Sequence, residues 1–152
     1  MPVRFETLDG RPTHEAGIVD EGLDAFNRDA APLDGVAYVT CVARNDAGDA
    51  IGGAVGRTWG ECAELMQLWV APAHRRQGIG AGLVRRFEAR AAARGCRTCY
   101  LTTWSFQAPR LYRALGYEVA WEIRGFPQGI AKYEMVRSLE ETPPQPEDHR
   151  AS

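Results

Sequence analysis

Residues 75 to 82, Arg-Arg-Gln-Gly-Ile-Gly-Ala-Gly, combine two cations with alternating glycines directly before a helical pattern. Because glycine has no Cβ, the backbone at 78, 80 and 82 can pass close to a bulky ligand. The first N–H groups of the following helix have no partner inside the helix, so they are available as donors. The helix dipole and the two arginines both favour an anion at this point. The segment therefore predicts a binding site for a pyrophosphate group.

Two common nucleotide-binding loops do not fit this segment. The P-loop needs a lysine followed by serine or threonine, and the only lysine of the chain is Lys132, far away in the sequence. The dinucleotide fingerprint Gly-x-Gly-x-x-Gly needs glycine where the chain has Leu83, and no ribose-binding acid follows at the expected spacing. The pyrophosphate must belong to another kind of ligand.

A third pattern, Arg/Gln-x-x-Gly-x-Gly/Ala after an apolar strand, fits residues 75–80. It resembles the coenzyme A pyrophosphate motif of the GNAT superfamily of N-acetyltransferases. Residues 105–117 resemble a second region of that family, Asn-x-x-Ala-x-x-x-Tyr followed by Leu-Gly-Phe/Tyr, with Ser105 in place of the asparagine. The run Ser-Phe-Gln-Ala-Pro within it, together with Phe126-Pro127-Gln128-Gly129, is similar to a group of small bacterial members of mostly unassigned substrate.

The resemblance implies that acetyl-CoA is the co-substrate. Backbone groups of 68–70 would grip the pantetheine arm as if it were an added strand, and one N–H there would face the thioester oxygen. The residues implied to bind the cofactor are Leu68, Trp69, Val70, Arg75, Arg76, Gln77, Gly78, Ile79, Gly80, Ala81, Ser105, Ala108 and Tyr112.

Two residues are candidates for proton transfer. The resemblance gives Tyr112 the role of general acid to the departing thiolate, since a phenol with a pKa of about 10 is protonated at neutral pH; the alternative is a tyrosine that only packs in the core. Glu64 has the spacing of a strand glutamate that deprotonates the amine through water in some members. Glu61 and Glu122 compete for that role, and many members need no dedicated base.

The leading function is an N-acetyltransferase that moves the acetyl group directly to a primary amine in a ternary complex, with a small-molecule acceptor. A covalent route is disfavoured, because no cysteine falls beside Tyr112 with a partnering histidine. The alternatives are a catalytically silent acyl-CoA-binding module and a protein-modifying acetyltransferase. Four aromatic residues could wall the acceptor pocket, or simply pack or form a dimer seam: Trp59, Trp69, Trp104 and Phe106.

The predicted fold is a single α/β domain over residues 1–138, with a mixed sheet and the GNAT order β-αα-βββ-α-β-α-ββ, in which strands 4 and 5 splay apart. Residues 139–152 are charged and rich in proline and are expected to be disordered. The expected strands are 3–8, 36–44, 50–58, 62–70, 99–103, 117–123 and 131–136. The expected helices are 16–28, broken near Gly22, then 78–94 and 109–115.

Composition narrows the partners. A net charge of −2 gives no reason to expect a nucleic-acid partner. The first residues carry no signal-peptide pattern and no apolar run reaches membrane length, so a cytoplasmic location without membrane contact is expected. The four cysteines at 41, 62, 96 and 99 lack further ligands at metal-site spacing, so no metal is expected, and 96 and 99 are interpreted as buried packing residues. A homodimer is considered possible.

Overall fold

The computed structural model describes residues 2–140 of the chain. These residues divide into two compact units, one up to Gly35 and the other from Val36 onward. The first unit contains helix α1 (Thr13–Ala30) and a short 3-10 turn, η1 (Leu33–Gly35). No strand forms over residues 3–8, contrary to the prediction, and α1 continues through Gly22 without a break. An alternating segment cannot form a strand without a partner, whereas one glycine inside a helix costs only about 1 kcal/mol.

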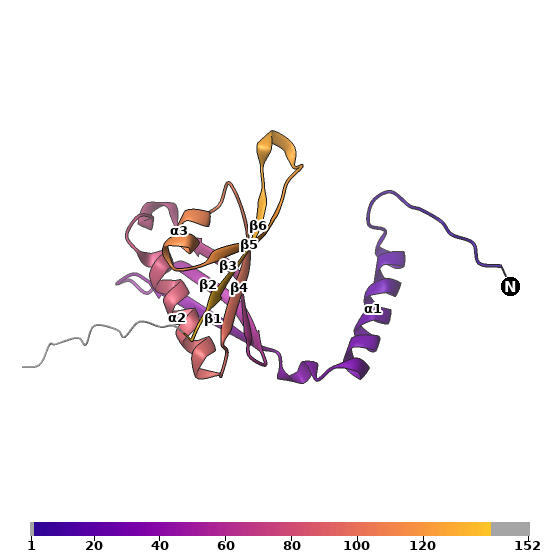
Figure 1. Cartoon of the computed structure of the whole chain (residues 1–152), viewed down its shortest axis with the longest axis horizontal. Helices are drawn as coiled ribbons and strands as arrows, with labels where there is room; N and C mark the ends of the chain where they lie inside the picture. Colours follow the sequence, from indigo (N-terminus) through magenta and orange to yellow (C-terminus); the bar gives the residue numbers. More distant parts are fainter. Residues whose placement is uncertain (1, 141–152) are drawn as a thin grey trace, which may run out of the picture. The chain divides into compact units, whose positions relative to one another are not determined.

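The second unit is built on a mixed sheet with strand order β1-β2-β3-β4-β6-β5 (Figure 1). All neighbouring strands are antiparallel except β3 and β4, which are parallel and are joined through helix α2. The predicted mixed sheet is therefore confirmed. Its elements are β1 (Ala37–Arg44), β2 (Ala50–Trp59), β3 (Cys62–Val70), η2 (Pro72–His74), α2 (Ile79–Ala93), β4 (Thr98–Trp104), α3 (Pro109–Ala114), β5 (Glu118–Ile123), η3 (Pro127–Gly129) and β6 (Lys132–Ser138).

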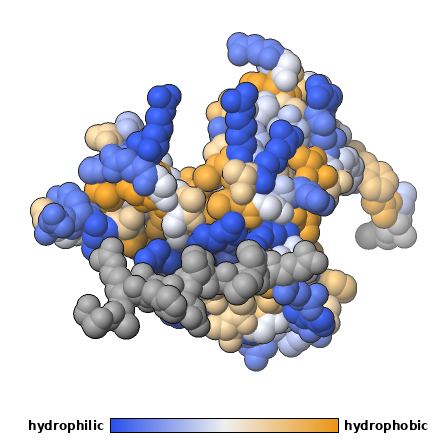
Figure 2. All heavy atoms as spheres, turned by 60° about the vertical axis from the view of Figure 1, so that its left-hand side comes forward, coloured by the Kyte–Doolittle hydropathy of each residue, from blue (hydrophilic) through white to orange (hydrophobic). Residues whose placement is uncertain are grey.

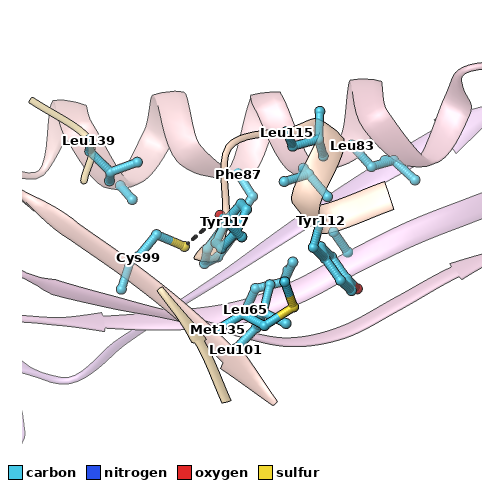
Figure 3. Packing of buried hydrophobic residues seen from close by; sticks show 14 of the residues in the cluster. Leu65, Leu83, Phe87, Cys99, Leu101, Tyr112, Leu115, Tyr117, Met135 and Leu139 are labelled. Carbon is cyan, nitrogen blue, oxygen red and sulfur yellow. Dashed lines mark hydrogen bonds between the residues drawn. The ribbon is translucent and has the colours of Figure 1, made fainter. Parts of the chain in front are cut away.

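The core of this unit lies between α2 and one face of the sheet (Figure 3). The helix buries Leu83, Val84, Phe87 and Ala91, the apolar stripe that the 3.6-residue period predicts. Cys96 and Cys99 are buried and unbridged, as expected of small apolar side chains. The buried set also includes Leu139, so the folded unit extends at least to that residue, and the rest of the predicted tail, from 141 onward, lies outside the described residues.

A buried polar cluster interrupts the apolar core. Glu88 of α2 is only 4% exposed, although the helical pattern predicts it away from the buried stripe. Its carboxylate pairs with Arg137 of β6 and with Arg85 at 2.9 Å, and it accepts a hydrogen bond from the Tyr117 hydroxyl at 3.3 Å. Cys99 Sγ lies 3.1 Å from the oxygen of the same hydroxyl, within hydrogen-bond distance, and burial raises the pKa of that thiol to about 11. A carboxylate can be buried here because two cations and a hydroxyl replace its water.

The pairing between β3 and β4 is short. It runs from Cys62 opposite Thr98 to Leu65 opposite Leu101 and goes no further, although β3 continues to Val70. A bulge at Met66, where β3 carries one more residue than β2, lies directly after the last of these pairs. The two strands therefore part toward their carboxyl ends, as predicted for strands 4 and 5.

The surface mixes apolar and charged side chains. Figure 2 shows apolar patches between long hydrophilic side chains on one face, in keeping with a chain that is 45% hydrophobic and 25% charged. Among residues 2–140, no helix has the length and apolar character needed to cross a membrane.

Candidate functional site

A cavity of about 860 Å³ opens where β3 and β4 part. Its walls come from the end of β3, the loop containing η2, the first turn of α2, the end of β4, and α3. This is the edge at which an open α/β sheet offers a ligand site. The predicted site residues that line it are Leu68, Trp69, Val70, Arg75, Arg76, Gly78, Ile79, Gly80, Ala81, Ala108 and Tyr112. Gln77, Ser105 and Glu64 do not line it.

The first turn of α2 faces this cavity with unpaired donors. Arg76 and the N-cap Gly78 both have left-handed backbone angles, with φ of 62° and 77°, which turn the chain sharply into the helix. The first bond of the helix runs from the Gly82 N–H to the Gly78 carbonyl at 3.0 Å, and no side chain caps the turn. The N–H groups of residues 79–81 are therefore available, and the turn carries no acidic residue that would repel an anion.

The open edge of β3 offers backbone groups in the same cavity. The Ala71 N–H donates to the Ile51 carbonyl of β2 at 2.8 Å. The backbone N–H and carbonyl groups of the odd-numbered residues at this end of β3 therefore point toward β2. Successive residues of a strand alternate, so Leu68 and Val70 direct their N–H and carbonyl groups to the side that β4 has left. Arg75 Nε donates a hydrogen bond to the Val70 carbonyl at 3.0 Å. The remaining groups are free to pair with an extended ligand.

Tyr112 projects from α3 into the core beside the cavity (Figure 3). It is 7% exposed, and its ring packs edge-on against that of Tyr117 at 5.9 Å between centroids. Burial raises the pKa of Tyr112 to about 12, so the phenol stays protonated well above neutral pH. No residue in the described part of the chain forms a hydrogen bond with its hydroxyl, which leaves that proton available to a ligand.

Ser105, which the sequence predicts at the cofactor, does not line the cavity, whereas Gln107 does. The Ser105 N–H donates to the Ala131 carbonyl at 2.8 Å, and its Oγ accepts from the Ala131 N–H at 3.0 Å, so it fastens the end of β4 to β6. Gln107 lines the cavity, and its Oε1 accepts from the Trp104 N–H at 3.0 Å and the Thr103 hydroxyl at 3.2 Å. Its Nε2 is therefore left as a donor. Gln107 occupies an unspecified position of the pattern Asn-x-x-Ala, so the motif does not distinguish it from any other residue.

Glu64 lies on β3 between two residues that are buried against α2, so its side chain is on the opposite face of the sheet. The carboxylate is 26% exposed and accepts from Arg57 Nε and Nη2 at 3.1 and 3.0 Å. It also accepts from the Tyr100 hydroxyl at 3.1 Å. The competing Glu61 is exposed, 4.0 Å from Arg97, and the structure brings none of the three candidate glutamates, Glu122 included, into the cavity lining.

An aromatic group stands at the end of β4. The Trp104 ring makes a T-shaped contact with Phe126 at 4.8 Å between centroids and stacks with Phe106 at 6.0 Å. Trp104, Phe106 and Trp69 line the cavity, whereas Trp59 does not. The loop near Phe126 was expected beside the acceptor, but Lys132 was not singled out, because only the pairing of β4 with β6 brings it there. Residues 2–140 hold no cluster of three or more side chains suited to a metal ion.

Comparison with known proteins identifies the family. The model of the Acetyltransferase (GNAT) family matches residues 9–117. A blasticidin-S acetyltransferase of Streptomyces morookaense is 37% identical over 112 residues, which are 73% of this chain and 80% of that protein. Two solved structures are similar in fold. An acetyltransferase from Bacillus cereus has a TM-score of 0.73 at 24% identity, covering 88% of this chain and 97% of its own. A nourseothricin acetyltransferase has a TM-score of 0.59 at 25% identity, covering 67% and 65%. The chain belongs to the GNAT family of acetyltransferases.

Proposed function

We propose that the protein transfers the acetyl group of acetyl-CoA to the primary amine of a small molecule, directly, within a ternary complex. The observation that carries the proposal is the single cavity that joins an anion-binding helix start, an open strand edge and the buried phenol of Tyr112. The names of the relatives support the acceptor class, because two of them are acetyltransferases of blasticidin S and nourseothricin.

The donor would lie along the cavity from α2 toward Tyr112. Its pyrophosphate would accept from the N–H groups of residues 79–81, with Arg75 and Arg76 beside it. The amides of the pantetheine arm would pair with the free groups of Leu68 and Val70. We assign the side-chain contact to this arm to Gln107 rather than to Ser105, because only Gln107 presents an unpaired donor to the cavity.

In the transfer step the amine nitrogen attacks the thioester carbonyl carbon, the C–S bond breaks and the thiolate leaves. A backbone N–H of residues 68–70 would stabilise the oxyanion, and Tyr112 would donate its proton to the sulfur. None of the four cysteines lines the cavity, which favours direct transfer over an acyl-enzyme. The proton of the amine goes to water; Glu64 could receive it only through a water chain, because it is outside the lining.

Thiol release tests this function. We expect the protein to release coenzyme A from acetyl-CoA only when a suitable amine is present, and to form the N-acetyl product in equal amount. The amine panel should include blasticidin S and nourseothricin beside simple primary amines and a lysine-containing peptide. Thermal stabilisation by acetyl-CoA without release for any amine would instead identify a silent binding module. Acetylation of the peptide alone would identify a protein-modifying enzyme.

A substitution at Gly80 tests the position of the donor. A Cβ built here lies 3.4 Å from the Leu111 side chain and 3.8 and 3.9 Å from those of Val70 and Leu68, all of which line the cavity. Gly80→Ala therefore fits at ordinary contact distance, whereas Gly80→Val puts two more methyl groups into this space. We expect valine to weaken coenzyme A binding by about 10- to 100-fold, or roughly 1.4 to 2.8 kcal/mol.

Calorimetric titration with coenzyme A measures this loss, and Gly80→Ala serves as the matched control with affinity close to wild type. Circular dichroism should show the same helix content in both variants. If Gly80→Val bound coenzyme A as tightly as the wild type, the first turn of α2 would not be the pyrophosphate site.

A further inference from the structure

Lys132, the only lysine of the chain, lines the cavity without an ion-pair partner among residues 2–140. It is the first residue of β6 and stands directly opposite Trp104, the last residue of β4, so both side chains are on the same face of the sheet. The ammonium group lies 5.3 Å from the centre of the Trp104 ring. A ring attracts a cation but does not neutralise it, so the charge of Lys132 remains available to an anion.

The position of Lys132 and Trp104 is fixed by aromatic packing and by hydrogen bonds between β4 and β6. Phe106 stacks with the Trp104 ring and Phe126 makes a T-shaped contact with it, so two aromatic neighbours restrain the indole. The two hydrogen bonds between Ser105 and Ala131 fasten the end of β4 to the start of β6, one residue from each member of the pair. The cation is therefore presented by a braced strand pair rather than by a loose loop.

The charges of the lining separate into two groups. Arg75 and Arg76 precede α2, on the β3 side of the opening. Lys132 lies beyond β4, because the strand order is β3-β4-β6. No aspartate or glutamate is among the lining residues. The two arginines and the helix start can neutralise the phosphates of the donor, and Lys132 faces a different part of the cavity.

We propose that Lys132 and Trp104 form an acceptor subsite that binds a carboxylate or phosphate group carried by the amine substrate. This inference rests on the proposed function and names its substrate class: small amines that also carry an anion. The anion accepts a charge-assisted hydrogen bond from the Lys132 ammonium, and the apolar part of the substrate lies on Trp104 and Phe106. A neutral or purely cationic amine lacks this contact.

Matched acceptor pairs test the subsite. β-Alanine is compared with β-alaninamide for the carboxylate, and O-phosphoethanolamine with ethanolamine for the phosphate. We expect the wild type to prefer the anionic member of one pair in kcat/KM by about tenfold or more, the gain expected from one charge-assisted hydrogen bond. Lys132→Met should abolish this preference through KM for the acceptor, whereas Lys132→Arg should retain most of it. KM for acetyl-CoA should stay within about twofold in both variants.

A binding measurement gives the result without turnover. The N-acetylated forms of the same four compounds are titrated into the coenzyme A-loaded protein, and the wild type should bind the anionic forms more tightly while Lys132→Met should not. Equal binding and equal turnover of anionic and neutral members would overturn the subsite and leave the proposed function standing. Thiol release with no amine would overturn the proposed function, and the titration would still decide whether Lys132 binds the anion.

Discussion

Replacing Tyr112 by phenylalanine should lower kcat for acetyl transfer by about 10²- to 10³-fold, the usual contribution of a positioned general acid. The reason is that the variant loses the proton that we assign to the departing thiolate, while the ring and its packing against Tyr117 remain. KM for acetyl-CoA should change by less than about threefold, because the proton matters only as the C–S bond breaks. Steady-state thiol release with a saturating acceptor measures both constants.

Tyr117→Phe provides the matched control for this substitution. Its hydroxyl lies within hydrogen-bond distance of both Glu88 and Cys99, whereas the Tyr112 hydroxyl has no hydrogen-bond partner among residues 2–140. Tyr117→Phe should therefore lower the free energy of unfolding by roughly 1–3 kcal/mol and leave kcat nearly unchanged. Tyr112→Phe should instead lower kcat and leave the free energy of unfolding nearly unchanged. A kcat equal to that of the wild type in Tyr112→Phe would remove this residue from the mechanism.

Alanine at Gly56 should destabilise the second unit by about 3 kcal/mol or more, which for a chain of this size lowers Tm by roughly 6–12 °C. A Cβ at this position would press on the backbone carbonyl oxygen of Glu64 and lie 2.5 Å from two atoms of the Phe87 ring. Neither neighbour can move freely, because one is sheet backbone and the other fills the centre of the core. Thermal and urea unfolding followed by circular dichroism measure the loss.

Gly22→Ala is the control for the general effect of adding a methyl group. This glycine lies inside α1, where a Cβ meets nothing within 4 Å. Alanine there should stabilise the helix slightly, because it forms helix more readily than glycine by about 1 kcal/mol. If Gly56→Ala unfolded at the wild-type temperature, the close packing of Phe87 on β2 would be incorrect.

The parts of the fold that were predictable are those whose signal is local. The apolar stripe of α2 and the glycines before it describe one helix and its start, so residues 75 to 82 were placed correctly from sequence. The alternation over residues 3–8 is also a local signal, but a strand exists only when another strand pairs with it. Glu88 shows the same limit, because its cations come from Arg137, far along the chain, as well as from its own helix.

The residues of the candidate site also fall into those that a local motif predicts and those that only the folded chain brings together. Tyr112 and the helix start belong to short motifs, and they line one cavity. Gln107 and Lys132 line it too, but their importance depends on hydrogen bonds to β4 and on the pairing of β4 with β6. No spacing rule within a single segment encodes such contacts. The roles of Gln107 and Lys132, like those of Tyr112 and Glu64, are predictions, and the substitutions at Lys132 and Tyr112 test two of them.

The short pairing between β3 and β4 limits how firmly the two halves of the sheet are held together. Four residue pairs connect the half formed by β1, β2 and β3 to the half formed by β4, β5 and β6. A donor arm lying along Leu68 and Val70 would lengthen this seam, as an extra length of strand does. The molecule that is consumed in each turnover would thus also hold the two halves of the sheet together. The sheet would be most rigid when loaded and loosest after product leaves.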